Sequence, residues 1–212
     1  SIILIHRKII WKRSLTMNEK NYFYHGSISS NITELKALSL LHDENKKVLY
    51  LTDNIPYALF YIWDGKHNNY DRKFVTGWIK NGAAYYEELF PMQLEIFYKG
   101  VSGYLYCVKK IPNILPVNKN DSMYYSEKNI SIDCAVYIPD IYSKLMEYEA
   151  LGKFKLLRFN EQPLEKQNEL IGKSVDIILK SNFFKNDEPK LNFYKKYFPT
   201  AWERAVLLCG KS

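Results

Sequence analysis

The order of strand-like and helix-like segments constrains the fold of this chain most strongly. Strand-like runs at residues 47–52, 103–110 and 154–159 are separated by helix-like stretches, but the two kinds do not alternate regularly. A doubly wound parallel sheet requires that alternation, so this architecture is disfavoured. The pattern contains about seven strands and five or six helices. It predicts an α+β domain with a strongly antiparallel or split sheet.

Local signals refine this pattern. Leucines at helical spacing predict a helix over residues 33–41, and Pro56 behind a capping Asp53 or Asn54 predicts another that runs to about residue 65. Asn81-Gly82 lies between two strand-like runs and predicts a hairpin, because both residues tolerate positive φ. The same reasoning predicts strands at 21–25, 47–52, 103–110, 130–138 and 154–159, helices at 91–99 and 140–152, a loop at 66–72, and a helical pattern from 163 onward.

Charge and composition divide the chain into three parts. Residues 1–16 carry four of the basic residues and no acid, so they supply +4 of the net charge of +7 among 212 residues. A nucleic-acid-binding interpretation based on net charge therefore loses most of its support. Met17 has the character of a natural start, which makes 1–16 either an upstream extension or an edge strand or amphipathic helix packed on the body. We expect a core at 17–160 and a helical extension at 161–212.

The chain lacks the signals of a membrane or secreted protein. No stretch approaches the ~20 apolar residues that span a bilayer, and His6 interrupts the nearest candidate for a signal core. The three cysteines, Cys107, Cys134 and Cys209, are odd in number and widely spaced. They indicate reduced thiols and a cytoplasmic location, with no membrane partner and no structural metal site.

Two short motifs point to a ligand site. A strand reading Tyr24-His25-Gly26-Ser27 places an imidazole beside backbone that lacks a Cβ, where a flat amide can approach closely. A second strand reads Leu49-Tyr50-Leu51-Thr52-Asp53, and the next predicted helix carries Ala58 and Tyr61. The rings of Tyr50 and Tyr61 could hold a flat polar ring such as nicotinamide between them.

These motifs resemble those of the ADP-ribosyltransferase superfamily, in its diphtheria-toxin and poly(ADP-ribose) polymerase branch. The resemblance is carried by residues 22–63 and extends more loosely in strand order to about residue 159. It implies a split, antiparallel sheet that binds NAD as a substrate, with flanking helices. In such a sheet, His25 bonds a ribose hydroxyl, Gly26 holds the nicotinamide carboxamide through its backbone, and Tyr50 and Tyr61 stack on the ring. Many relatives have serine where Ala58 aligns, so one anchor for the carboxamide is missing. The resemblance assigns NAD binding to His25, Gly26, Ser27, Tyr50, Thr52 and Tyr61.

The resemblance also implies a catalytic glutamate near the start of a late strand, acting with His25 and Tyr50. A carboxylate there stabilises the oxocarbenium-like cation that forms when the nicotinamide–ribose bond breaks, and no metal is needed. Glu127, just ahead of the predicted strand at 130–138, is the first candidate. The other candidates are Glu147, Glu149, Glu87 and Glu88.

Each of these residues also has a plain structural interpretation: a partly buried histidine, core tyrosines, and a solvated glutamate in a turn. Three functions therefore stay open. The first is an ADP-ribosyltransferase of the His-Tyr-Glu type that transfers ADP-ribose to a protein, a nucleic acid or a small molecule. The second is an inactive module of the same fold that binds NAD, ADP-ribose or a partner. The third is an RNA 2′-phosphotransferase, which shares the fold but needs several basic groups that the sequence near His25 and Tyr50 does not show.

Overall fold

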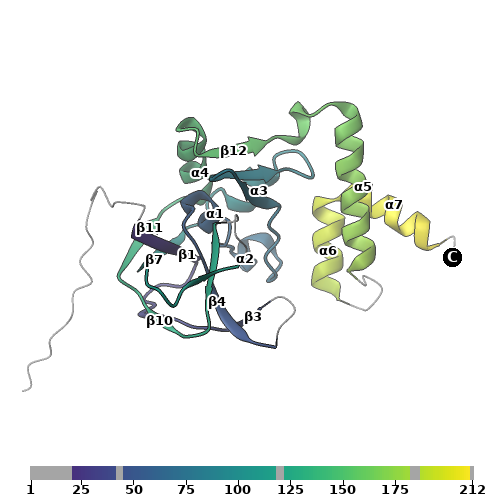
Figure 1. The fold of residues 1–212 in the computed structure, drawn as a ribbon. Coiled ribbons are helices and arrows are strands. Elements are labelled where there is room, and N and C mark those ends of the chain that lie inside the picture. The colour runs from purple at the N-terminus through teal and green to yellow at the C-terminus, as the bar shows by residue number, and fades with distance from the viewer. Residues whose placement is uncertain (1–20, 42–44, 118–121, 182–186, 211–212) are drawn as a thin grey trace, which may run out of the picture.

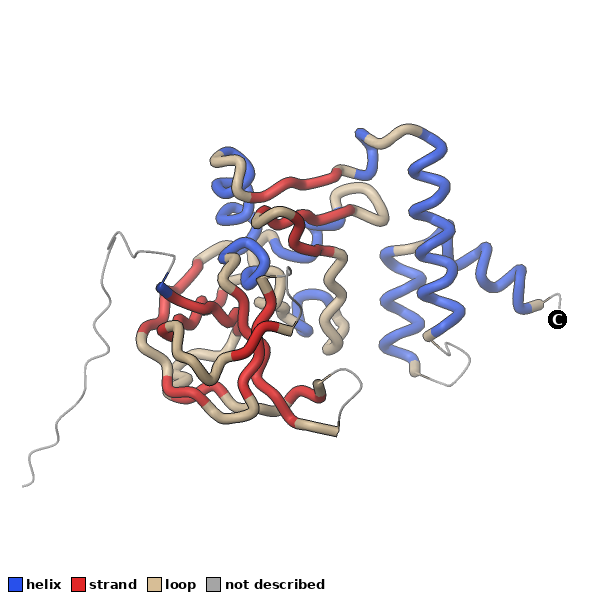
Figure 2. Tube along the Cα trace, viewed as in Figure 1, coloured by secondary structure: helices blue, strands red, loops and turns tan. Residues whose placement is uncertain are grey.

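The structure is a computed structural model of the whole chain that describes residues 21–41, 45–117, 122–181 and 187–210. Within them the fold is α+β, as the pattern of segments predicts, and its sheets are antiparallel except for one strand pair. Strands gather in one part of the molecule, and the last three helices stand together beside them (Figures 1 and 2).

A seven-stranded sheet forms the centre of the fold, in the order β11-β7-β1-β4-β9-β8, with β3 also paired to β4. A smaller sheet has the order β12-β6-β5, and β10 pairs with β2. The strands are β1 Tyr22–Ser27, β2 Glu34–Leu35, β3 Ser39–Leu40, β4 Lys47–Thr52, β5 Gly77–Lys80, β6 Ala83–Glu87, β7 Gly103–Lys109, β8 Leu115–Pro116, β9 Met123–Ser126, β10 Ile130–Ser131, β11 Cys134–Ile138 and β12 Phe154–Leu157. The helices are α1 Ile55–Leu59, α2 Gly65–Asn68, α3 Gln93–Tyr98, α4 Ile141–Ala150, α5 Leu164–Lys180, α6 Glu188–Tyr197 and α7 Pro199–Cys209, with a 3-10 helix at Phe159–Glu161.

Successive side chains of a strand point to opposite faces of the sheet, and side chains on both faces of the large sheet are buried. On β1, Phe23 points into a small cluster on one face, while Tyr24 points into the main core on the other. The main core also contains residues of α1, α3, α4 and the C-terminal helices. The two sheets and the terminal helices therefore share one hydrophobic core.

Several local predictions are confirmed. The strand at 47–52 is β4, and Asn54 caps α1 by accepting a hydrogen bond from the backbone N–H of Tyr57, with Pro56 in the first turn. Asn81 and Gly82 join β5 to β6 with φ values of 52° and 77°, the left-handed conformations that the hairpin signal requires. Asp140 caps α4, and Gly152 follows that helix with a φ of 69°.

The helix predicted at 33–41 is wrong. The segment is extended and forms β2 and β3, which pair with β10 and β4. Of the leucines at helical spacing, Leu35 is buried and Leu41 is partly buried, but Leu38 between them is 71% exposed, so they do not form one apolar helical face. Strand pairing to two neighbours outweighs the spacing of the side chains here.

Three boundaries also differ from the predictions. α1 ends at Leu59 instead of near residue 65, because the chain turns so that Ile62 and Trp63 can enter the core. The loop predicted at 66–72 contains the last part of α2, which Asp64 caps through the backbone N–H groups of Lys66 and His67. The single strand predicted at 130–138 is divided into β10 and β11, and between them Asp133 accepts a hydrogen bond from the backbone N–H of Lys109.

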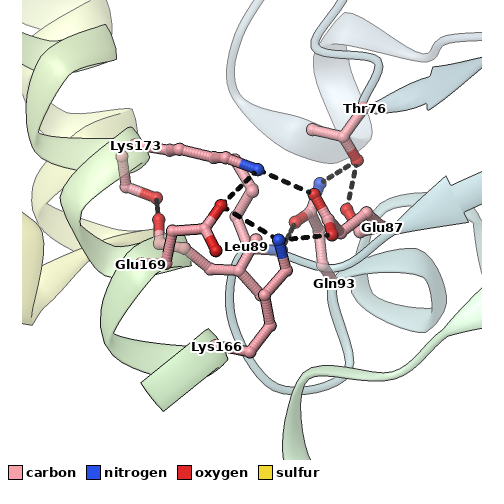
Figure 3. A network of polar contacts seen from close by, with 9 residues as sticks. Thr76, Glu87, Leu89, Gln93, Lys166, Glu169 and Lys173 are labelled. Atoms are coloured by element: carbon pink, nitrogen blue, oxygen red, sulfur yellow. Dashed lines mark hydrogen bonds and ion pairs between the residues drawn. The ribbon is translucent and has the colours of Figure 1, made fainter. Parts of the chain in front are cut away.

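The C-terminal helices are fixed to the smaller sheet by charges as well as by apolar contacts. Figure 3 shows Lys166 and Lys173 of α5 reaching Glu87 at the end of β6, with Nζ–Oε distances of 3.5 and 3.3 Å. Beside them, Gln93 donates to the hydroxyl oxygens of Thr76 and Tyr86 and accepts from the N–H of Leu89. Polar contacts thus surround the junction between α5, β6 and α3.

Candidate functional site

The candidate site lies where β1 and β4 separate. β1 pairs with β7 over its whole length, but its register with β4 consists of one pair, Tyr24 opposite Thr52. Beyond that pair a cavity of about 580 Å³ opens, within the usual size range of sites for small molecules. It is lined by Tyr24, His25, Gly26, Lys36, Leu38, Ser39, Leu49, Tyr50, Leu51, Thr52, Tyr57, Ala58, Tyr61, Lys73 and Met123.

His25 bridges the separated strands. Its Nδ1–H donates a hydrogen bond of 3.1 Å to the backbone carbonyl of Tyr50, which fixes the tautomer and leaves Nε2 as an acceptor. Burial lowers the pKa of His25, the bond to Tyr50 opposes this effect, and the nearby Lys73 charge adds to it. The imidazole is therefore mainly neutral at pH 7, and its Nε2 can accept a hydrogen bond from a hydroxyl group.

Two tyrosines line this cavity: Tyr50 of β4 and Tyr61, which lies in a turn after the end of α1 instead of in the predicted helix. Tyr50 is half-buried, and its hydroxyl donates to the carbonyl of Leu40 on β3 at 3.2 Å. Tyr61 bonds through its hydroxyl to Tyr57 at 3.1 Å, and the two rings meet edge to face with centroids 5.5 Å apart. Burial raises the pKa of Tyr61 well above its usual value, so the phenol stays protonated.

Gly26 lies where α1 crosses β1, so packing alone requires a glycine. A Cβ at this position would lie 2.2 Å from the backbone oxygen of Ala58 and 2.8 Å from the side chain of Ile62. Both Gly26 and Ala58 also line the cavity. The need for a bare backbone at Gly26 is therefore explained without a ligand.

Thr52 and Ser27 make local contacts. The Thr52 hydroxyl donates to the carbonyl of Ser122 at 2.7 Å. It also accepts from the N–H of Asn54 at 3.0 Å, and this second bond joins β4 to the start of α1. Thr52 lines the cavity, whereas Ser27 does not; the Ser27 hydroxyl accepts a hydrogen bond from the N–H of Ser29. Ser27 therefore stabilises the turn after β1.

The structure does not bring Glu127 to this cavity. Glu127 follows the last residue of β9, and its neighbour Ser126 pairs with Leu49, which lines the cavity. Glu127 itself is not among the residues that line the cavity. Glu127 is half exposed and lies 3.5 Å from the Lys46 ammonium. No aspartate or glutamate is found among the described residues that line the cavity.

The other candidate carboxylates are engaged elsewhere. Glu87 pairs with the lysines of α5, and Glu147 pairs with Lys144 on its own helix. Glu149 holds both terminal nitrogens of Arg158 at 2.9 and 2.7 Å. Glu88 is buried and accepts hydrogen bonds from the backbone N–H groups of Leu94 and Phe159.

Two lysines of the site were missed by the sequence analysis. Lys36 lies in the segment predicted as a helix, and Lys73 lies just before the first strand of the hairpin. The Lys73 ammonium is 5.6 Å from the centroid of the Tyr61 ring, within range of a cation–π interaction. Neither lysine belongs to a motif, so only three-dimensional contact reveals them.

Comparison with known proteins adds no assignment: no family model matches the chain, and neither the curated proteins nor the solved structures give a significant match. In the part of the chain that the structure describes, no three His, Cys, Asp or Glu side chains are grouped to hold a metal ion. None of the described helices combines the length and apolar character needed to cross a bilayer.

Proposed function

We propose that the cavity between β1 and β4 binds NAD and that the chain is an NAD-dependent ADP-ribosyltransferase with an ADP-ribosyltransferase-like split sheet. The observation that carries this proposal is the opening of the sheet at Tyr24 and Thr52, with His25, Gly26, Tyr50 and Tyr61 all lining the resulting cavity. These residues come from three separate sequence features, the strand with His25 and Gly26, the strand with Tyr50, and the segment with Tyr61.

In the proposed complex, the neutral His25 accepts a hydrogen bond from a ribose hydroxyl at Nε2. Its orientation is set by the bond from Nδ1 to Tyr50. The rings of Tyr50 and Tyr61 contact the nicotinamide. Nicotinamide leaves as a neutral molecule, so its departure needs no strong acid, and ADP-ribose passes to an acceptor.

A specific observation favours a second candidate, a module that binds NAD or ADP-ribose without turnover. The described lining of the cavity contains no carboxylate to stabilise the cation that forms during transfer. Ala58 also offers no hydroxyl to the carboxamide. The two lysines at the cavity bring basic groups that an RNA 2′-phosphotransferase would need, so we test that activity as well.

Nicotinamide release from labelled NAD distinguishes these functions. The experiment uses the full chain with candidate acceptors and a cell lysate, and compares it with Tyr50→Phe and Tyr50→Leu. For a transferase we expect release by the wild type, near-normal release by Tyr50→Phe, which keeps the ring, and at least a tenfold loss in Tyr50→Leu, as for loss of a stacking contact.

Two further arms complete the test. Glu127→Gln is expected to release nicotinamide like the wild type, because Glu127 does not line the cavity and pairs with Lys46; loss of release with normal NAD binding would contradict this expectation. Binding of NAD without release supports the module, and loss of phosphate from a 2′-phosphorylated RNA supports the phosphotransferase. If NAD does not bind, the proposed function is wrong.

We include a cytoplasmic location and the absence of a membrane partner in the proposal. Cys107 and Cys134 are described, and both are free thiols. Free thiols are usual in a reducing compartment. The acceptor is the open part of the proposal, which the lysate arm of the experiment addresses.

A further inference from the structure

The charged groups at the cavity are of one sign. Among its described lining residues, Lys36 and Lys73 are basic, His25 is mainly neutral, and no residue is acidic. Cavities lined by one sign of charge focus the field on the ligand they hold. The ligand of this cavity therefore meets an excess of positive charge.

Lys73 carries most of this argument because of where its ammonium lies. It is placed over the ring of Tyr61 and close enough to His25 to lower the pKa of the imidazole. No described aspartate or glutamate lies within ion-pair distance of Lys73. Partial burial lowers the pKa of Lys73 itself, as expected for an ammonium without a nearby counter-charge.

The parts of NAD respond in opposite ways to such a charge. The pyrophosphate is anionic and is attracted to it, whereas the oxidised nicotinamide ring is cationic and is repelled. ADP-ribose keeps the pyrophosphate and lacks the ring. NADH keeps nearly the whole shape of NAD, but its ring is neutral.

We propose that the cavity selects pyrophosphate ligands without a cationic ring, so that it binds ADP-ribose and NADH more tightly than NAD, and that Lys73 is the residue that sets this preference. The inference rests on the proposed function, because it takes the nicotinamide end of the ligand to lie near Tyr61. It deepens that function by naming the ligand class: ADP-ribose-type anions. In an active transferase, this preference would also keep ADP-ribose bound in the cavity after water hydrolyses NAD.

Calorimetric titration of the full chain with NAD, NADH and ADP-ribose tests this inference. NAD and NADH form a matched pair, because they differ mainly in the charge of one ring. At low ionic strength we expect NADH and ADP-ribose to bind about fivefold more tightly than NAD, the size typical of charge interactions that water still reaches. The preference is expected to shrink as salt is added, because the cavity is open to solvent and ions screen the charge of Lys73.

Two lysine variants locate the effect. Lys73→Met removes the charge and keeps an apolar stem, and it is expected to bring the three affinities within about twofold of one another, since the single-charge contribution is lost. Lys80→Met is the matched control: Lys80 ends β5, is exposed and does not line the cavity. It should keep the wild-type preference.

The outcomes separate the inference from the proposed function. NAD binding as tightly as NADH or ADP-ribose overturns the inference and leaves the proposed function standing. A preference that survives in Lys73→Met overturns the assignment to Lys73. Failure of all three ligands to bind overturns the proposed function itself.

Discussion

At Gly26, the close approach of α1 leaves no room for a side chain, so substitution tests the packing of this crossing. Because a Cβ would lie 2.2 Å from the Ala58 oxygen, we expect Gly26→Ala to destabilise the fold by about 3 kcal/mol and to lower the melting temperature by about 6–12 °C. Gly172→Ala is the control: its Cβ meets no atom within 4 Å, and it lies within α5. That variant should gain about 0.5–1 kcal/mol, because alanine favours a helix. Equal melting temperatures for the two variants would contradict the placement of α1 on β1.

His25 should make stability depend on pH. Its pKa in the folded protein lies below the ordinary value of 6.5, so the unfolded chain binds more protons in this range. The contribution of His25 to stability is then fully present above pH 6.5 and is lost as the pH falls through the lower pKa of the folded state. Urea denaturation of the wild type and of His25→Gln, from about pH 7.5 to about pH 5.5, measures it.

We expect the stability advantage of the wild type over His25→Gln to decrease on acidification. The other histidines are common to both proteins and cancel in the difference. An advantage that grows as the pH falls would mean that His25 is protonated in the folded protein. This result would also remove the Nε2 acceptor from the proposed NAD site.

At the scale of elements, Glu87 and Glu88 are adjacent residues with different roles at the end of β6. Glu88 is buried, and each of its oxygens accepts a backbone hydrogen bond, one from α3 and one from the 3-10 helix. An amide at this position would set an NH₂ group against one of these donors, so we expect Glu88→Gln to cost about 1–3 kcal/mol. Glu87 instead meets Lys166, which is partly buried, and Lys173, which is exposed, and Glu87→Gln should cost less than about 1 kcal/mol.

Chemical denaturation of these two variants measures the difference. The substitution is the same in both, so the neighbouring positions serve as controls for each other. If Glu87→Gln proved the more damaging change, α5 would be held mainly by its ion pairs. The backbone hydrogen bonds that Glu88 accepts would then contribute less to stability than the ion pairs of Glu87.

The elements that could be predicted from the sequence are those whose signals are local. The cap of α1 at Asn54 and the hairpin at Asn81-Gly82 depend on side chains within a few residues, and both are confirmed. The segment at 33–41 could not be predicted, because its conformation depends on pairing with β4, which follows it in the chain, and with β10, which lies much further along. Leucine spacing contains no information about these partners.

The residues of the candidate site fall into the same two groups, those that sequence motifs indicate and those that only the fold brings together. His25, Tyr50 and Tyr61 belong to motifs with strand or helix context, and the structure brings them to one cavity. Lys36 and Lys73 reach that cavity only because distant segments fold against it. The choice of glutamate depended on which side chains near the end of β9 reach the cavity, and the sequence around Glu127 does not specify this.

At the scale of the whole molecule, the C-terminal helices share the core of the strand-rich part. Phe193 of α6 stacks on Tyr70 with ring centroids 4.3 Å apart, and it also lies 5.9 Å from Phe97 of α3. We therefore expect Phe193→Ala to cost about 3–5 kcal/mol, because it leaves a cavity in a close-packed aromatic cluster. Leu207→Ala, at a position that is 63% exposed on α7, should change stability by less than about 0.5 kcal/mol.

The same packing leads us to expect one cooperative unfolding transition for the full chain, with the strand-rich core unfolding together with α5, α6 and α7. Thermal unfolding of Phe193→Ala, followed by near-ultraviolet and far-ultraviolet circular dichroism, checks this expectation. Coincident transitions with a lowered midpoint support a single core. A second transition that appears only in the variant would show that the helices unfold separately.

The central claim is that a pyrophosphate ligand binds where β1 and β4 separate, and a crystal structure of the full chain grown with ADP-ribose tests it most directly. We expect electron density for the ligand between His25, Tyr50 and Tyr61, with a ribose hydroxyl on the Nε2 atom of His25 and the pyrophosphate near Lys73. Ligand density only at another place on the molecule, or an unoccupied cavity at saturating ADP-ribose, would contradict the claim.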